Sequence, residues 1–151
     1  MSLIFSQYAA KGNAFVNRVA EELQVQHDQA ARIVRSVLHA LRNRLSHEES
    51  FQLLAQLPMA LKSVYVDGWK YSDNYTRLRR PEDFLDEIRK EDDGMAGYDF
   101  GNNKRAALAT AAVFNVLFES ISEGEVQGLI NTLPESLQIW IQKLEKTELG
   151  K

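Results

Sequence analysis

Apolar residues recur at intervals of three and four along residues 29–45, with polar residues between them. The apolar positions are Ala30, Ile33, Val34, Val37, Leu38, Leu41 and Leu45. This spacing places them on one face of an α-helix, because a helix turns once every 3.6 residues. We therefore predict a long amphipathic helix here, with Asp28 placed to cap it or to complement its dipole.

Two shorter helices are predicted next in the chain. Ser46 and Glu49 have the spacing of a capping box, and the apolar residues Phe51, Leu53 and Leu54 follow them. Pro58 fits the start of another helix, because a proline in the first turn loses no hydrogen bond that the helix needs. Gly68 is expected to end that helix.

The same signals return in the second half of the chain. At one constant offset Ser46 falls on Ser122 and Pro58 on Pro134, together with the apolar positions around them. Phe84-Leu85 resembles Phe15-Val16 at a smaller offset, so extra residues lie in the Gly-rich stretch 92–103. A match of capping residues, prolines and apolar spacing predicts two copies of one helical unit, although a single sequence does not separate duplication from convergence.

These elements predict an all-α fold, since no segment shows a convincing strand alternation. We expect a helical bundle of about eight helices, made of two repeated units that pack about a pseudo-twofold axis. The predicted single domain spans 1–151, with unit one at about 2–68, a connector at about 69–80 and unit two at about 81–147.

Composition narrows the possible functions. The chain has 151 residues, a net charge of -3 and no cysteine. The acidic balance argues against a dedicated nucleic-acid binder, and the lack of cysteine excludes disulfides, thiolate metal sites and cysteine nucleophiles. No basic start with an apolar run and no long apolar stretch is present, so we expect a cytoplasmic protein without membrane insertion.

Four short segments are shared with a known family: Ala40-Leu41-Arg42-Asn43-Arg44-Leu45, Gln56-Leu57-Pro58 with Leu61, Tyr65 with Asp67-Gly68-Trp69, and Phe84-Leu85. On these residues the sequence resembles, over nearly the whole chain, a bacterial family catalogued only as domain of unknown function 2267. The resemblance implies a duplicated helical fold in a bacterial protein. It implies no activity and no catalytic residues.

No pattern indicates a catalytic, metal or cofactor site. The histidines His27, His39 and His47 lack the spacing that places two ligands on one helix face, and no phosphate-binding loop or nucleophile elbow occurs. The acidic stretch Glu91 to Asp99 departs from the spacing of a calcium loop, so we expect a solvated connector there. Enzymatic activity is unsupported rather than excluded.

Arg32, Arg35, His39 and Arg42 fall together on the predicted helix 29–45, opposite its apolar face. We call these four residues the basic ridge. It could bind an acidic protein, nucleic-acid phosphates or an anionic lipid surface. The alternative is a solvated helix face that pairs with neighbouring acids.

The corresponding helix of the second unit, Lys104 to Ser120, is apolar over more than half its circumference. Such a helix must be covered, either inside the domain or by another subunit. The second possibility predicts a homodimer that forms through Leu108, Ala111 and Phe118.

Aromatic and basic residues alternate in the connector: Trp69, Tyr71, Tyr75, Arg77, Arg79 and Arg80. Single-stranded nucleic-acid binders use such combinations, because rings stack on bases and cations meet phosphates. The aromatic residues could also cover one end of the core where the chain crosses between units.

The preferred interpretation is a non-enzymatic interaction or regulatory module that binds a protein partner. The alternative is a small-molecule or enzymatic domain with a pocket between the two units, near Trp69, Tyr71 and Tyr75. Weak nucleic-acid binding through the connector comes third.

Overall fold

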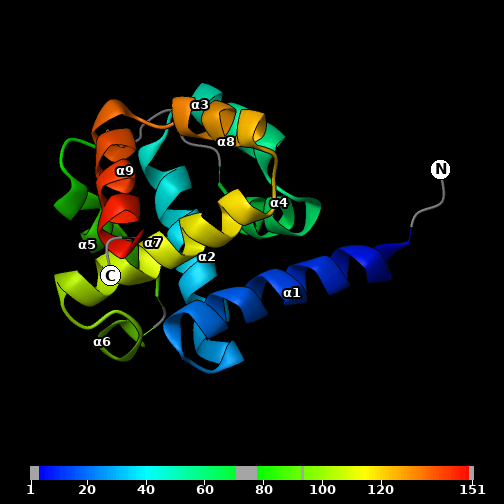
Figure 1. Cartoon of the computed structure of the whole chain (residues 1–151), viewed down its shortest axis with the longest axis horizontal. Coiled ribbons are helices and arrows are strands. Elements are labelled where there is room, and N and C mark those ends of the chain that lie inside the picture. The colour runs from blue at the N-terminus through cyan, green and yellow to red at the C-terminus, as the bar shows by residue number, and fades with distance from the viewer. Residues whose placement is uncertain (1–3, 71–77, 93, 150–151) are drawn as a thin grey trace.

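The computed structural model describes residues 4–70, 78–92 and 94–149, the last six of these by their backbone alone. Across these residues all regular structure is helical, which confirms the all-α prediction (Figure 1). The nine helices are α1 (Phe5–Leu23), α2 (His27–Arg44), α3 (His47–Gln56), α4 (Met59–Val66), α5 (Pro81–Glu91), α6 (Ala96–Asp99), α7 (Asn103–Glu119), α8 (Glu123–Asn131) and α9 (Glu135–Leu149).

The helix starts agree with the local sequence signals. The Ser46 hydroxyl accepts a hydrogen bond from the Glu49 N–H at 3.1 Å, and the Glu49 carboxylate accepts one from the Ser46 N–H at 2.8 Å. This is the predicted capping box. At α8 the Ser122 hydroxyl accepts from the Glu125 N–H at 3.3 Å, and it also donates to the Glu125 carboxylate at 3.1 Å.

Two other boundary residues take slightly different roles from those expected. Pro58 is the cap residue itself, and its carbonyl accepts the first helical hydrogen bonds of α4. Asp28 lies inside the first turn of α2 rather than at the cap, so it complements the helix dipole. Gly68 follows α4 with φ +71°, a backbone conformation that favours glycine.

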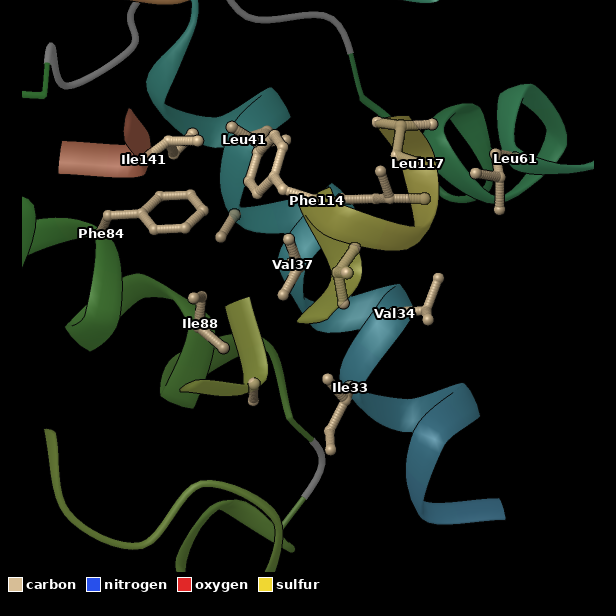
Figure 2. Close-up of a cluster of buried hydrophobic side chains, with 14 of the residues drawn as sticks. Ile33, Val34, Val37, Leu41, Leu61, Phe84, Ile88, Phe114, Leu117 and Ile141 are labelled. Carbon is tan, nitrogen blue, oxygen red and sulfur yellow. The ribbon is translucent and has the colours of Figure 1, made fainter. Parts of the chain in front are cut away.

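Helix α2 lies at the centre of the fold. It contacts α1, α4, α5, α6 and α7, and its predicted apolar face is buried. Figure 2 shows side chains of five helices that meet in the core: Ile33, Val34, Val37 and Leu41 of α2, Leu61 of α4, Phe84 and Ile88 of α5, Phe114 and Leu117 of α7, and Ile141 of α9. One core therefore contains residues of both predicted units, while the twofold relation between the units stays a prediction.

Helix α7 is the second central helix, because it contacts α1, α2, α5 and α9. Ala111 is buried, and Leu108 and Phe118 are half-buried. The apolar circumference of α7 is thus covered largely by helices of the same chain, which is the first of the two possibilities raised above. A homodimer through these three residues stays a prediction.

Helix α6 was not expected. It lies in the Gly-rich stretch that distinguishes the two predicted units, and it contacts α2 and α5. None of the helices in the described parts of the chain is both long and apolar enough to span a membrane.

Candidate functional site

Arg32, the first residue of the basic ridge, is paired with a buried acid on α6. Its Nε donates to Asp99 Oδ2 at 2.8 Å and its Nη2 donates to Asp99 Oδ1 at 3.0 Å. Burial alone would raise the pKa of Asp99, but the hydrogen bonds from Arg32 and Asp92 hold that pKa below its usual value. The ion pair between Arg32 and Asp99 therefore joins α6 to α2.

His39 is only 1% exposed, so the expectation that it forms part of a surface ridge is wrong. Its Nε2 lies 2.8 Å from the Val64 carbonyl oxygen, to which it donates in the tautomer that carries the proton on Nε2. Burial lowers the pKa of His39 and favours the neutral ring. The residue joins α2 to the last turn of α4.

Arg42 binds the end of α4. Its Nη1 donates to the carbonyl oxygens of Tyr65 at 2.8 Å and Asp67 at 2.6 Å, which satisfies acceptors that a helix end leaves open. Burial lowers the pKa of Arg42. Arg35 is exposed. A docking role of the basic ridge would therefore depend on Arg35 and on the exposed part of Arg32.

In the described part of the connector, Trp69 packs against the hydrophobic core. The Trp69 ring lies edge-on to Tyr65 with a centroid distance of 5.7 Å, and to His47 with 6.0 Å. Arg79 and Arg80 are exposed, and Arg80 pairs with Asp83 at 3.2 Å. Tyr71, Tyr75 and Arg77 lie outside the described residues, so nucleic-acid binding and a pocket near these aromatic residues stay untested.

The acidic stretch is not the solvated connector that the sequence suggested. Asp92 is 5% exposed and Asp99 is 3% exposed. Asp99 lies on α6 and bonds to Arg32 of α2, whereas Asp92 caps the end of α5 and hydrogen-bonds to Asp99. Within the described ranges, no three or more histidine, aspartate or glutamate residues are grouped so that they could hold a metal ion.

A groove of about 640 Å³ lies between α1, the turn from α3 to α4, the end of α7 and the start of α8. Its apolar lining consists of Gly12, Ala14, Phe15, Ala55, Leu57, Pro58, Ala60, Leu61, Val116 and Ile121. Its polar lining consists of Lys11, Arg18, Gln56, Glu119, Ser120 and Glu125. Residues of both predicted units therefore meet in one partly apolar depression.

An ion pair crosses one side of the groove. Arg18 on α1 donates to Glu119 at the end of α7 through Nη2 at 2.7 Å and through Nε at 3.1 Å. The hydrogen bond with Glu119 raises the pKa of Arg18. Glu21 and Glu22 each lie 3.5 Å from the same guanidinium. The positive charge at this side of the groove is thus compensated within the chain.

Residues 4–10 lead away from the groove and form what we call the arm. Figure 1 shows the N-terminal half of α1 extending beyond the other helices. On the arm Ile4 is 44% exposed and Phe5 is 70% exposed, and the Phe5 and Tyr8 ring centroids lie 6.4 Å apart. The arm begins where α1 crosses α4 so closely that a Cβ on Gly12 would lie 2.9 Å from the Ala60 Cβ.

Sequence reasoning missed both the groove and the arm. The arm had a signal, because Phe5, Tyr8, Gly12, Phe15 and Val19 recur at intervals of three and four. The first two continue, past the protein body, the face that is buried at Phe15 and Val19. The groove had no signal in the sequence, because it is formed only by the packing of α1 against α4 and α7.

The profile of a protein family described as "Uncharacterized conserved protein (DUF2267)" matches residues 12–139. The chain belongs to this family. No curated protein matches the chain. The DUF2267 match includes every residue that lines the groove except Lys11, whereas the arm precedes it. The DUF2267 description assigns no activity, so the function of the chain is unknown and has to be argued from its geometry.

Proposed function

We propose that this chain is a non-enzymatic interaction module that binds an amphipathic helix of a protein partner in the groove. The observation that carries the proposal is the groove itself, whose lining combines apolar side chains with charged and polar ones. Grooves of this composition hold amphipathic helices, whose anchors recur at positions i, i+3, i+4 and i+7. The arrangement of charges on α2 does not favour an acidic partner, because Arg32 and Arg42 are already bonded inside the chain.

The polar groups of the groove support binding rather than catalysis. Arg18 and Glu119 satisfy each other, and the lining offers partly exposed apolar side chains such as Pro58 and Ile121. A general acid or base needs a group poised toward a reacting atom with a pKa suited to its task. The apolar lining supplies contact area instead.

A small apolar ligand is the second candidate occupant. The groove volume of about 640 Å³ falls within the range of known ligand sites, roughly 300–1,000 Å³. The groove also lies between the two predicted units, although it is not near Trp69.

Selection from a phage library of helical peptides tests the proposal. We expect enriched peptides to carry apolar residues at helical spacing and to bind Ala55→Trp, which fills the groove, at least about tenfold more weakly than the unmodified chain. Gln52→Trp is the matched control, because Gln52 is exposed on the same helix and does not line the groove. Peptides that bind all three proteins equally would overturn the proposal.

A further inference from the structure

We infer that the helix bound in the groove is the arm of a second copy of this chain, so that two copies exchange arms in a reciprocal dimer. This inference rests on the proposed function, since it names the partner of the same groove. It differs from the dimer expected through α7, because that helix is covered by its own chain.

The arm is an apolar helical surface that the described part of its own chain does not cover. Phe5 is 70% exposed, and Tyr8 lies beside it on the next turn of α1. Short helices without tertiary packing are marginal in water, and contiguous exposed apolar surface marks interaction sites. The arm therefore gains stability when its aromatic face is buried.

The positions of arm and groove suit a twofold arrangement. Both are built on α1, the arm from residues 4–10 and the groove from Lys11, Gly12, Ala14, Phe15 and Arg18. Because α1 is one continuous helix, its arm cannot fold back into the groove of the same chain. A twofold axis that passes beside α1 near the start of the groove would bring each arm to the groove of the other copy, which closes the assembly at two.

The charges of the two surfaces are compatible. Residues 4–10, Ile-Phe-Ser-Gln-Tyr-Ala-Ala, carry no charged side chain. The arm can therefore enter beside the Arg18–Glu119 pair without burying a new charge, which would be costly if left unpaired. The exposed Met59 follows Pro58 of the groove and extends the apolar surface that the arm can cover.

The area that arms and grooves can bury is that of a weak dimer. An aromatic side chain buries about 150–250 Å² when it is fully covered. Two arms supply four such side chains, of which the Tyr8 pair is already half-buried, and the two grooves lose a similar area. The total is at most about 700–1,200 Å², which lies at the lower end of specific protein interfaces and corresponds to a weak dimer.

Sedimentation equilibrium of the full chain gives the first test. We expect a dimer whose dissociation constant rises at least about tenfold in Phe5→Glu, because a carboxylate cannot enter the apolar groove. Phe51→Glu and Ile139→Glu are matched controls, since Phe51 and Ile139 are exposed apolar residues on other helices, 64% and 47% exposed. Circular dichroism verifies that each variant is folded. A monomeric unmodified chain, or equal weakening by the controls, overturns the inference.

Cysteine cross-linking gives the second test, because the chain has no native cysteine. Ala9→Cys, an exposed position of the arm that leaves Phe5 and Tyr8 intact, and Ala55→Cys are placed in separate chains of different mass, mixed and oxidised. We expect the mixed disulfide to form much faster than with Ile139→Cys in place of Ala55→Cys. Equal rates overturn arm exchange. If the mixed disulfide does not form while groove-dependent peptides are still selected, the second copy is the wrong partner and the proposed function stands. If neither the disulfide nor such peptides are obtained, both arm exchange and the proposed function are refuted.

Discussion

The buried hydrogen bond between Tyr65 and Ser50 allows a quantitative test of the packing at the end of α4. The two hydroxyl oxygens lie 2.7 Å apart, and both residues are 0% exposed. A buried polar group that loses its partner costs about 1–3 kcal/mol, whereas removal of both partners is close to neutral. The two single substitutions should therefore be strongly non-additive.

The two hydroxyls differ in whether each can find a new hydrogen-bond partner when the other is removed. In Tyr65→Phe the Ser50 hydroxyl can rotate toward the carbonyl of Ser46, so we expect a loss of about 1 kcal/mol. In Ser50→Ala the Tyr65 hydroxyl is fixed by its ring, which costs about 2 kcal/mol, and the better helix propensity of alanine returns about 0.5 kcal/mol. The double variant should lose only about 0.5 kcal/mol, so the coupling is about 2 kcal/mol.

Urea unfolding followed by circular dichroism measures all four proteins, with thermal unfolding as a second readout. A coupling of this size corresponds to a difference of about 4–8 °C between the observed melting temperature of the double variant and the value expected from additive singles. If the double variant loses the sum of the two single losses, the hydroxyls do not depend on each other and the reasoning is refuted.

Alkaline pH gives an independent check on Tyr65. Burial raises the pKa of Tyr65 above its usual value of 10. Above that pH the unfolded chain loses this proton while the folded chain keeps it, so the free energy of unfolding falls as the pH rises. Tyr65→Phe should remove part of this decline, and an unchanged slope above pH 10 would contradict the burial argument.

Three further predictions concern the helix contacts. Burial lowers the pKa of His39 from 6.5, so below that pH the unfolded chain binds more protons than the folded chain. The free energy of unfolding should therefore fall on acidification, by at most about 1.4 kcal/mol per pH unit. In His39→Gln the urea midpoint should depend less on pH. Gly12→Ala gains about 1 kcal/mol of helix propensity but loses about 1–3 kcal/mol to overpacking against Ala60, so it should destabilise, and Ala60→Gly should rescue it. Arg32→Ala should lower the melting temperature more than Asp99→Asn. The first substitution leaves a buried carboxylate without its cation, whereas the second leaves a guanidinium that reaches water. Equal losses in melting temperature would contradict this reasoning.

Local sequence signals predicted the helices well because their causes are local. The Ser46 and Glu49 side chains meet the backbone three residues away, and Pro58 acts within its own turn. The apolar face of α2 was also visible, since periodicity fixes which residues share a side. The family resemblance found on short motifs agrees with the match over residues 12–139.

The polar side of α2 could not be predicted in the same way. Periodicity places Arg32, His39 and Arg42 on one side of a helix, but it does not say which helices lie against that side. Helix α6 brings Asp99 to Arg32, and α4 brings its carbonyl groups to His39 and Arg42. Arg32, His39 and Arg42, which lie opposite the apolar face, therefore bond to neighbouring helices and do not form a free surface.

The groove shows the same limit. Its residues come from segments far apart in the sequence, such as Ala14 on α1, Ala55 on α3 and Ile121 before α8. None of these segments has a motif that marks a binding site. The exposed half of α1 was within reach of sequence reasoning, because Phe5 and Tyr8 continue a helical stripe into a segment that the described residues leave largely uncovered.

The packing of α1 against α7 has a consequence for synthesis on the ribosome. Glu119, which bonds to Arg18, is made about one hundred residues after it, so the side of α1 that packs against α7 stays uncovered until most of the chain has been translated. Helices α2 and α4 can cover the rest of α1 earlier, because they follow it directly in the chain. Fragments that stop before the end of α7 should consequently keep this one side of α1 exposed and aggregate more readily than the full chain.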